Sequence, residues 1–184
     1  MRALLMHDIT PDDVVADLLT TAGYDIVRCT ERRDDEFPCR GAGGSCPLDG
    51  SVDVAVVVHD RPSVDLAPGE VGVVCALRDG VPVVVAGNHT QSAYVAHCRA
   101  VAADLDDIPA ACARAITAAQ HRASHFVTSF AGVPAEVVRR GHRVMVHVAA
   151  EATDHQVVLA HQGATRFYPS ARTIDVAKDF SEPD

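Results

Sequence analysis

One short run of residues constrains the fold more than any other feature of the chain. Residues 52–58 read VDVAVVV, which is an almost continuous stretch of apolar, β-branched side chains. Such a stretch is typical of a central strand in a parallel sheet, because helices cover a strand of this kind on both faces. A second run of the same type, at residues 81–86, predicts a neighbouring strand. The chain is therefore expected to fold around a buried parallel sheet.

Strand-like and helical patterns alternate on either side of these runs. Further strands are expected at residues 2–6, 24–29 and 98–102, and helices at residues 11–22, 71–77 and 104–126. Thr10 and Pro11 provide an N-cap and a first helical residue, and Gly23 favours termination of the first helix. Strands that alternate with helices predict a doubly wound α/β layer.

The pattern changes near Val133 and Pro134. Alternating apolar residues at 144, 146 and 148 predict a strand with one buried face. The sequence TDHQ at residues 153–156 is a capping box and predicts a helix to Phe167, and residues 172–176 predict a last strand. The expected α/β fold is thus a five-stranded, mostly parallel, flavodoxin-like sheet over residues 1–130, followed by a small α+β (β-α-β) annex over residues 134–180.

A cysteine-rich loop lies where this fold would place a crossover helix. Residues 36–50 contain Cys39, Cys46 and four glycines, and Cys29 ends the preceding strand. Ordering such a loop costs conformational entropy unless a metal, a cluster or a disulfide offsets that cost. We therefore predict that Cys29, Cys39 and Cys46 bind a cofactor.

The spacing of the three cysteines leaves the kind of site open. The tight CxxC pairs of common zinc and ferredoxin sites are absent from this loop. Wider spacing is compatible with an iron–sulfur cluster, because a longer loop wraps its larger volume. An iron–sulfur cluster, a zinc ion, a Cys39–Cys46 disulfide and simple reduced thiols all stay open. His59 is a candidate fourth metal ligand, with His7, His89 and Cys75 as alternatives.

The other three cysteines and several histidines have simpler interpretations. Cys75, Cys98 and Cys112 lie among apolar residues and are expected to be core thiols. His121 and His125 are four residues apart on the long helix, a spacing that can hold a metal. Because the sequence offers them no third ligand, we expect both to be exposed to solvent.

Ligands of parallel sheets bind beyond the carboxyl ends of the strands. The predicted strand ends carry metal-binding or titratable residues, namely His7, Asp8, Cys29, His59, Asp60, Asn88 and His89. An alternative function is therefore an enzyme that acts on a small molecule in this crevice. His7, Asp8, His59 and Asp60 would then supply its acid–base groups.

Residues 2–120 resemble a response-regulator receiver domain. Asp8 follows the first strand, Asp60 follows the third, and the fourth strand begins GVPVVV at residue 80. The resemblance implies a flavodoxin-like fold in which Asp8 helps to bind magnesium and Asp60 accepts a phosphoryl group. Ala86 replaces the hydroxyl residue of that family, and the only lysine is Lys178, in the annex. The resemblance thus implies a degenerate receiver-like domain with different chemistry.

The charge of the chain limits the expected partners. The formal net charge is −9, and most of it lies in the first half. An acidic surface repels nucleic acid and anionic membranes, so neither is expected as a partner. No signal peptide or membrane-spanning segment is expected, which favours the cytoplasm, where stable disulfides are uncommon. A protein partner, or self-association through the annex, is expected instead.

These observations lead to one main functional hypothesis. The chain is expected to be a non-enzymatic cytoplasmic regulator or redox sensor that carries a cysteine-ligated metal or iron–sulfur site on a degenerate receiver-like domain. The alternatives are the small-molecule enzyme described above and a plain interaction scaffold.

Overall fold

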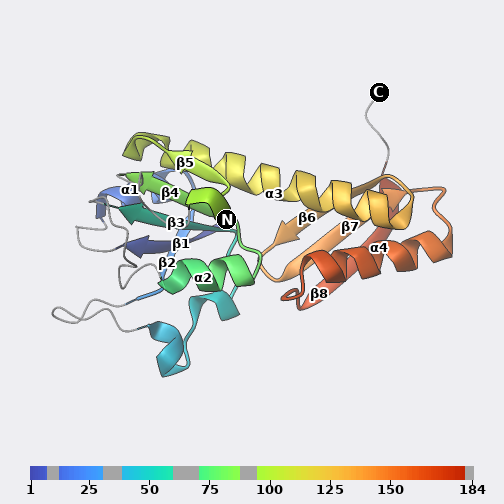
Figure 1. Cartoon of the computed structure of the whole chain (residues 1–184), viewed down its shortest axis with the longest axis horizontal. Helices are drawn as coiled ribbons and strands as arrows, with labels where there is room; N and C mark the ends of the chain where they lie inside the picture. The colour runs from blue at the N-terminus through green and yellow to red at the C-terminus, as the bar shows by residue number, and fades with distance from the viewer. Residues whose placement is uncertain (8–12, 31–38, 60–70, 88–94, 181–184) are drawn as a thin grey trace. The chain divides into compact units, whose positions relative to one another are not determined.

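The computed structural model describes residues 1–7, 13–30, 39–59, 71–87 and 95–180 (Figure 1). The chain divides into two compact units, Met1–Ile116 and Thr117–Asp184. This division falls within the long helix α3 (Ile108–Ala131), whereas the sequence suggested a boundary after that helix. Each unit has its own sheet.

The sheet of the first unit contains five strands, all parallel, in the order β2-β1-β3-β4-β5. This is the strand order of the flavodoxin-like fold. The predicted α/β class and the five parallel strands are therefore confirmed. The strands are β1 (Arg2–His7), β2 (Asp25–Arg28), β3 (Val54–His59), β4 (Val83–Gly87) and β5 (Ala100–Ala102).

Helices cover the two faces of this sheet because side chains alternate along each strand. On one face, Leu5 and Val56 pack with helix α1 (Asp13–Thr21) and with the first half of α3. On the other face, Met6 and Val57 pack with helix α2 (Val71–Arg78). All six residues of β3 are buried, as expected of a central parallel strand.

Turn residues end the first helix as the sequence indicated. Gly23 has a φ of 86°, a left-handed conformation that glycine adopts without steric cost. The backbone N–H of Tyr24 donates to the carbonyl of Leu19, which leads the chain directly into β2. The predicted N-cap at Thr10 and Pro11 lies outside the described residues.

The connection from β2 to β3 contains two short turns in its described part. These are the 3-10 turns η1 (Arg40–Gly43) and η2 (Pro47–Asp49). Leu48 of η2 is buried with β1, β3 and α2. This connection and α2 therefore cover the same face of the sheet. Two further turns, η4 (Val95–His97) and η5 (Leu105–Asp107), flank β5.

The second unit contains a three-stranded sheet in the order β6-β7-β8. Strands β6 (Ala135–Arg140) and β7 (Arg143–Ala149) form an antiparallel hairpin, and β8 (Thr173–Phe180) runs parallel to β7. The sequence did not predict β6. The hairpin turns at Gly141, which has a φ of 58°.

Helix α3 closes the free edge of β6 with two hydroxyl groups. The Ser124 hydroxyl accepts a hydrogen bond from the Val137 N–H at 2.9 Å, and the Thr128 hydroxyl accepts one from the Ala135 N–H at 3.0 Å. Four residues along a helix span about 6 Å, which matches the span of two residues along a strand. The helix thus satisfies edge groups that would otherwise be open to pairing with another strand.

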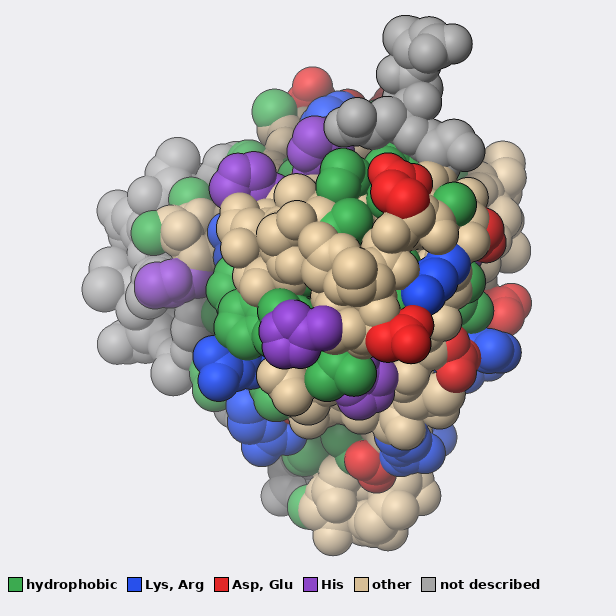
Figure 2. All heavy atoms as spheres, turned by 90° about the vertical axis from the view of Figure 1, so that its right-hand side faces the viewer, with side chains coloured by type: hydrophobic (Ala, Val, Ile, Leu, Met, Phe, Trp, Pro, Cys, Tyr) green, Lys and Arg blue, Asp and Glu red, His purple; other side chains and the backbone are tan. Residues whose placement is uncertain are grey.

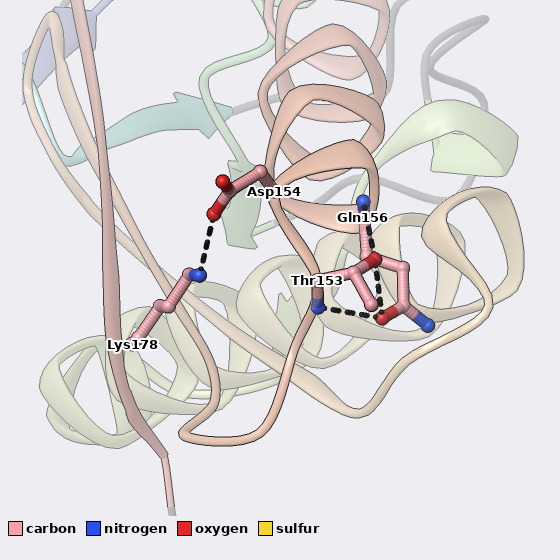
Figure 3. A network of polar contacts seen from close by, with 4 residues as sticks. All are labelled: Thr153, Asp154, Gln156 and Lys178. Carbon is pink, nitrogen blue, oxygen red and sulfur yellow. Dashed lines mark hydrogen bonds and ion pairs between the residues drawn. The ribbon is translucent and has the colours of Figure 1, made fainter.

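The capping box predicted from the sequence is present at the start of α4 (Asp154–Phe167) (Figure 3). The Thr153 hydroxyl accepts from the Gln156 N–H at 3.3 Å, and the Gln156 side chain accepts from the Thr153 N–H at 2.9 Å. Asp154, in the first turn, pairs with Lys178 of β8 at 2.8 Å. Its carboxylate also faces the positive end of the helix dipole.

Within the part of the chain that the structure describes, no helix has both the length and the apolar composition that crossing a bilayer requires.

Candidate functional site

Cys29 anchors the candidate site at the carboxyl end of β2. Its side chain is 5% exposed and packs on the face of the sheet that carries Met6 and α2. Its carbonyl accepts a hydrogen bond from the Arg40 N–H at 3.1 Å, and Thr30 forms an antiparallel bridge with Cys39. Backbone pairing therefore brings the second predicted cysteine next to the first.

Cys39 and Cys46 occupy equivalent positions in two successive turns. Each precedes a 3-10 turn, with φ and ψ of −65° and 124° at Cys39 and −60° and 124° at Cys46. Each carbonyl accepts from an N–H three residues later, at 3.0 Å in both cases. The loop thus presents its two thiols with the same local backbone geometry.

Both of these thiols converge on Gly41. A Cβ atom at Gly41 would lie 3.4 Å from the Cys39 sulfur and 3.6 Å from the Cys46 sulfur. Both sulfur atoms therefore lie within van der Waals distance of one point beside Gly41. Cys39 is exposed and Cys46 is half-buried, so the pair is open to solvent on one side.

The Cys29 thiol is protonated at neutral pH. Burial, and to a smaller extent the neighbouring thiols of Cys39, Cys46 and Cys75, together raise its pKa to about 11. A hydrogen bond between the Cys29 and Cys39 side chains acts in the same direction. All three predicted ligands therefore lie within electrostatic range of one another.

Cys75, which the sequence suggested as a core thiol or an alternative fourth ligand, also lies near these thiols. It lies on α2 three residues after Gly72, and it is half-buried beside the other thiols. A Cβ at Gly72 would lie 2.9 Å from the Cys29 sulfur, so this helix face contacts the site directly. From the sequence, Cys75 was named among the alternative fourth ligands, together with His7 and His89.

The two remaining cysteines lie among apolar residues, as expected. Cys112 is fully buried on the opposite face of the sheet, and burial raises its pKa to about 12. Cys98 is half-buried beside the α2 face, and burial raises its pKa to about 11. Neither thiol contributes to the raised pKa of Cys29.

The candidate histidine His59 is buried at the end of β3. It lies two strands away from β2, because β1 separates the two. Two strand spacings are about 10 Å, so the backbone does not place His59 beside Cys29. His7 ends β1 at the same edge of the sheet. Asp8, Asp60, Asn88 and His89 lie outside the described residues.

The four thiols are neighbours, but they do not form a preorganised metal site. In the described ranges, no group of three or more His, Cys, Asp or Glu side chains is arranged to hold a metal ion. Thiols bind metal as thiolates, so binding would release protons as well as draw the sulfurs together. The arrangement can supply soft sulfur ligands, which suit zinc and iron–sulfur clusters.

A separate groove lies within the second unit. Its volume is about 880 Å³, and polar side chains of α3, β6, β7 and β8 line it, including His121, His125, Glu136, His147 and Asp179. His121 and His125 are exposed, as predicted. His147 Nδ1 lies 2.7 Å from the Asp179 carboxylate. On the face drawn in Figure 2, histidine, acidic and basic side chains are interspersed among apolar ones.

The chain was also compared with known proteins. No family model, curated protein or solved structure gave a match.

Proposed function

We propose that the first unit is a non-enzymatic regulatory or sensor domain that binds an iron–sulfur cluster, or alternatively zinc, through Cys29, Cys39 and Cys46. The observation that carries this proposal is the proximity of the three thiols. Thr30, next to Cys29, forms a bridge with Cys39, and both loop sulfurs lie within 3.6 Å of a Cβ placed on Gly41. Three thiols in one place are an unusual arrangement for side chains that only fill a core.

The different exposure of the thiols supports a site that a metal or cluster enters from the solvent side. Cys29 is fixed in the core, whereas Cys39 is exposed and its turn is held by local hydrogen bonds. A metal or cluster could therefore enter at Cys39 and Cys46 and then reach Cys29. The raised pKa of Cys29 means that this ligand must release a proton, so loading is favoured at higher pH.

The receiver-like fold supports a regulatory role without phosphoryl transfer. The fold belongs to the flavodoxin-like class, but Ala86 has no hydroxyl at the end of β4. The only lysine of the chain, Lys178, pairs with Asp154 in the second unit. The thiol site therefore takes the place of a phosphorylated aspartate as the element that receives the signal.

The test is to purify the protein without oxygen and to measure its iron, acid-labile sulfide and zinc contents together with its visible spectrum. We expect one metal site per chain, lost in Cys39→Ala and retained in Cys112→Ala, whose thiol lies on the opposite face. If the protein neither contains metal nor binds it when reconstituted with ferrous iron and sulfide or with Zn²⁺, the proposal is wrong.

A Cys39–Cys46 disulfide is the second candidate, and the approach of both sulfurs to Gly41 favours it. Hydrogen peroxide would take one hydrogen from each thiol and be reduced to water as the S–S bond forms. Mass spectrometry of the peroxide-treated protein would then show the loss of two hydrogen atoms in a peptide that joins both cysteines. Loss of metal without this cross-link would favour the metal site instead.

We also propose self-association through the annex, as expected from its small core. Strand β8 supports this proposal because it ends the three-stranded sheet as an edge strand. Light scattering over a range of concentrations should show a dimer. A chain that stays monomeric at every concentration would argue against this part of the proposal.

A further inference from the structure

The three-stranded sheet of the second unit has one closed edge and one open edge. Helix α3 closes the edge of β6, because the Ser124 and Thr128 hydroxyls accept hydrogen bonds from backbone N–H groups of that strand. Strand β8 forms the other edge, and among the described strands only β7 pairs with it. β8 is eight residues long, and an edge of this length is a template for a further strand.

The two ends of this sheet differ in charge. At the β6–β7 turn, Arg140 and Arg143 are direct cross-strand partners, and the backbone N–H of Arg172 donates to a carbonyl of the turn at 2.9 Å. Asp175 pairs with Arg143 at 3.0 Å and so balances one of these three arginines. At the other end of the seven-residue strand β7, about 20 Å away, lies the carboxylate of Asp179. The basic end therefore favours an acidic partner surface.

The charges next to β8 lie on the open face of the sheet. Arg143 is the register partner of Thr173, and paired residues of neighbouring strands point to the same face. Asp179 points to this face too, because it contacts His147, which is the register partner of Ala177. Thr173 thus starts the open-face side of β8 at the basic end, and Asp179 finishes it at the acidic end.

We infer that β8 pairs antiparallel with β8 of a second copy, across a two-fold axis at Val176, so that two three-stranded sheets form one sheet of six strands. This inference rests on the self-association proposed above. The axis is perpendicular to the sheet, so the same face stays open in both copies. Antiparallel pairing sets the basic end of each copy beside the acidic end of the other, whereas parallel pairing would bring like charges together.

The charges along β8 select the position of the axis. An axis at either neighbour of Val176 would set two aspartates directly opposite each other, which is unfavourable. An axis farther from the centre of the strand would pair fewer residues. The axis at Val176 sets Thr173 opposite the partner's Asp179 and Asp175 opposite the partner's Ala177. No pair of residues in this register joins like charges.

This register also brings Arg143 toward a carboxylate of the partner. Thr173 has Arg143 as its neighbour on one side and would have the partner's Asp179 on the other. Two strand spacings, about 10 Å, separate the backbones of that arginine and that aspartate, a distance that their extended side chains can span. Because of the two-fold axis, this contact occurs twice in the dimer.

An exposed valine of α4 supplies an apolar contact beside the paired strands. Val158 is 52% exposed and follows Asp154 by four residues, which places both on one side of the helix. That side is directed toward β8, because Asp154 binds Lys178 of this strand (Figure 3). The axis at Val176 sets α4 of both copies on the same side of the joined sheet, so the two exposed valines point toward each other.

The first experiment changes the charge at Thr173, which is exposed. Thr173→Glu sets a second carboxylate opposite the partner's Asp179, while in its own chain the new side chain lies beside Arg143 and leaves the folded monomer stable. We expect the dissociation constant of the dimer, measured by analytical ultracentrifugation, to rise at least about fivefold. The double variant Thr173→Glu/Asp179→Lys should restore the wild-type value, because it makes the cross-strand pair attractive again.

Ser129→Glu is the matched control, because it adds the same charge at an exposed position of α3, the helix that closes the opposite edge. It should leave the dissociation constant unchanged. If the wild type dimerises and Thr173→Glu dimerises equally well, the antiparallel pairing of β8 is wrong while self-association stands. A wild-type chain that stays monomeric at every concentration overturns both.

A second measurement needs no variant. Hydrogen exchange of the wild-type chain is compared well below and well above the dissociation constant of the dimer. At the higher concentration we expect at least tenfold slower exchange at alternate amides of β8, those whose N–H groups point away from β7, and little change in β6. Equal exchange of the β8 amides at both concentrations, in a chain that dimerises, would contradict the inference.

Discussion

Gly72 of α2 lies against the Cys29 sulfur so closely that an added Cβ would be 2.9 Å from it. The same Cβ would be 2.6 Å from the sulfur of Met6 in β1. The contact joins the helix that follows β3 to the ends of two neighbouring strands. It is the structural reason why a thiol on α2 and a thiol after β2 become neighbours.

The Gly72→Ala substitution should test this contact through stability. In a helix without contacts, alanine would be more stable than glycine by about 1 kcal/mol. Here the clash with Met6 and Cys29 should instead lower the free energy of unfolding by about 1–3 kcal/mol. Urea-induced unfolding of the metal-free, reduced protein would measure the change.

Gly43→Ala is the control for that substitution, because nothing lies within 4 Å of a Cβ at Gly43. Its effect should be smaller than about 0.5 kcal/mol. A stabilised Gly72→Ala protein would show that α2 does not contact Cys29 as described.

The cysteines of the metal-free protein should differ widely in their rates of alkylation. A pKa of about 11 leaves only about one Cys29 thiol in a thousand as thiolate at pH 8, and burial limits reagent access. Cys112, with a pKa of about 12, should be slower still, whereas the exposed Cys39 should react first. Timed iodoacetamide labelling with peptide mapping gives the order. Labelling of Cys112 before Cys39 would contradict it.

The raised pKa values also predict a loss of stability at high pH. A thiol with an ordinary pKa near 9 ionises in the unfolded chain before Cys29 and Cys112 ionise in the folded protein. Unfolding therefore becomes easier as pH rises above about 9, by on the order of 3 kcal/mol for Cys29 up to pH 11 and on the order of 4 kcal/mol for Cys112 up to pH 12. Urea unfolding of metal-free, reduced protein at several pH values measures this slope. Cys112→Ala should make the slope shallower, and an unchanged slope would count against burial as the cause.

The hydrogen bond between the Ser124 hydroxyl and the Val137 N–H should contribute to the stability of the second unit. Ser124→Ala leaves the buried Val137 N–H without the hydroxyl that accepts its hydrogen bond, at a cost of about 1–2 kcal/mol. Hydrogen exchange of the Val137 amide should accelerate accordingly. Ser129→Ala, at an exposed position of the same helix, should leave that exchange rate unchanged. Equal exchange rates in both variants would argue against the edge contact.

The capping box of α4 should make a measurable contribution to stability. Thr153→Ala removes the hydroxyl that accepts from the Gln156 N–H, and we expect a loss of about 1 kcal/mol in thermal or urea unfolding. Thr153→Ser keeps an accepting hydroxyl and should retain the wild-type stability. If serine and alanine behave alike at this position, the cap does not contribute as proposed.

Local patterns predicted most elements of this chain because those elements depend on residues close in sequence. The valine-rich run gave a central strand with every residue buried, and Gly23 ended α1 in a left-handed conformation. The pairing of Thr153 with Gln156 was also readable, since both partners lie within one helical turn. Strand β6 was missed because its alternation of apolar and polar residues is short and ends in two arginines.

The candidate site was likewise predicted only in part from the sequence. The sequence placed Cys29, Cys39 and Cys46 around one connection. In the structure, a backbone bridge between Thr30 and Cys39 brings the start of this connection next to Cys29. The sequence named Cys75 only as one of several alternative fourth ligands, because a local pattern does not show which of them approaches Cys29. Its place beside Cys29 depends on how α2 packs.

By itself, then, the sequence determined the alternation of strands and helices, the parallel sheet and the cysteine-rich loop that replaces a crossover helix. The tertiary structure alone decided which thiols meet. Side-chain alternation sends Cys29 to the α2 face of the sheet, and Gly72 lets that helix approach closely enough to bring Cys75 alongside. Contacts of this kind join segments far apart in the chain, so they cannot be predicted from the periodicity or spacing of residues within one segment.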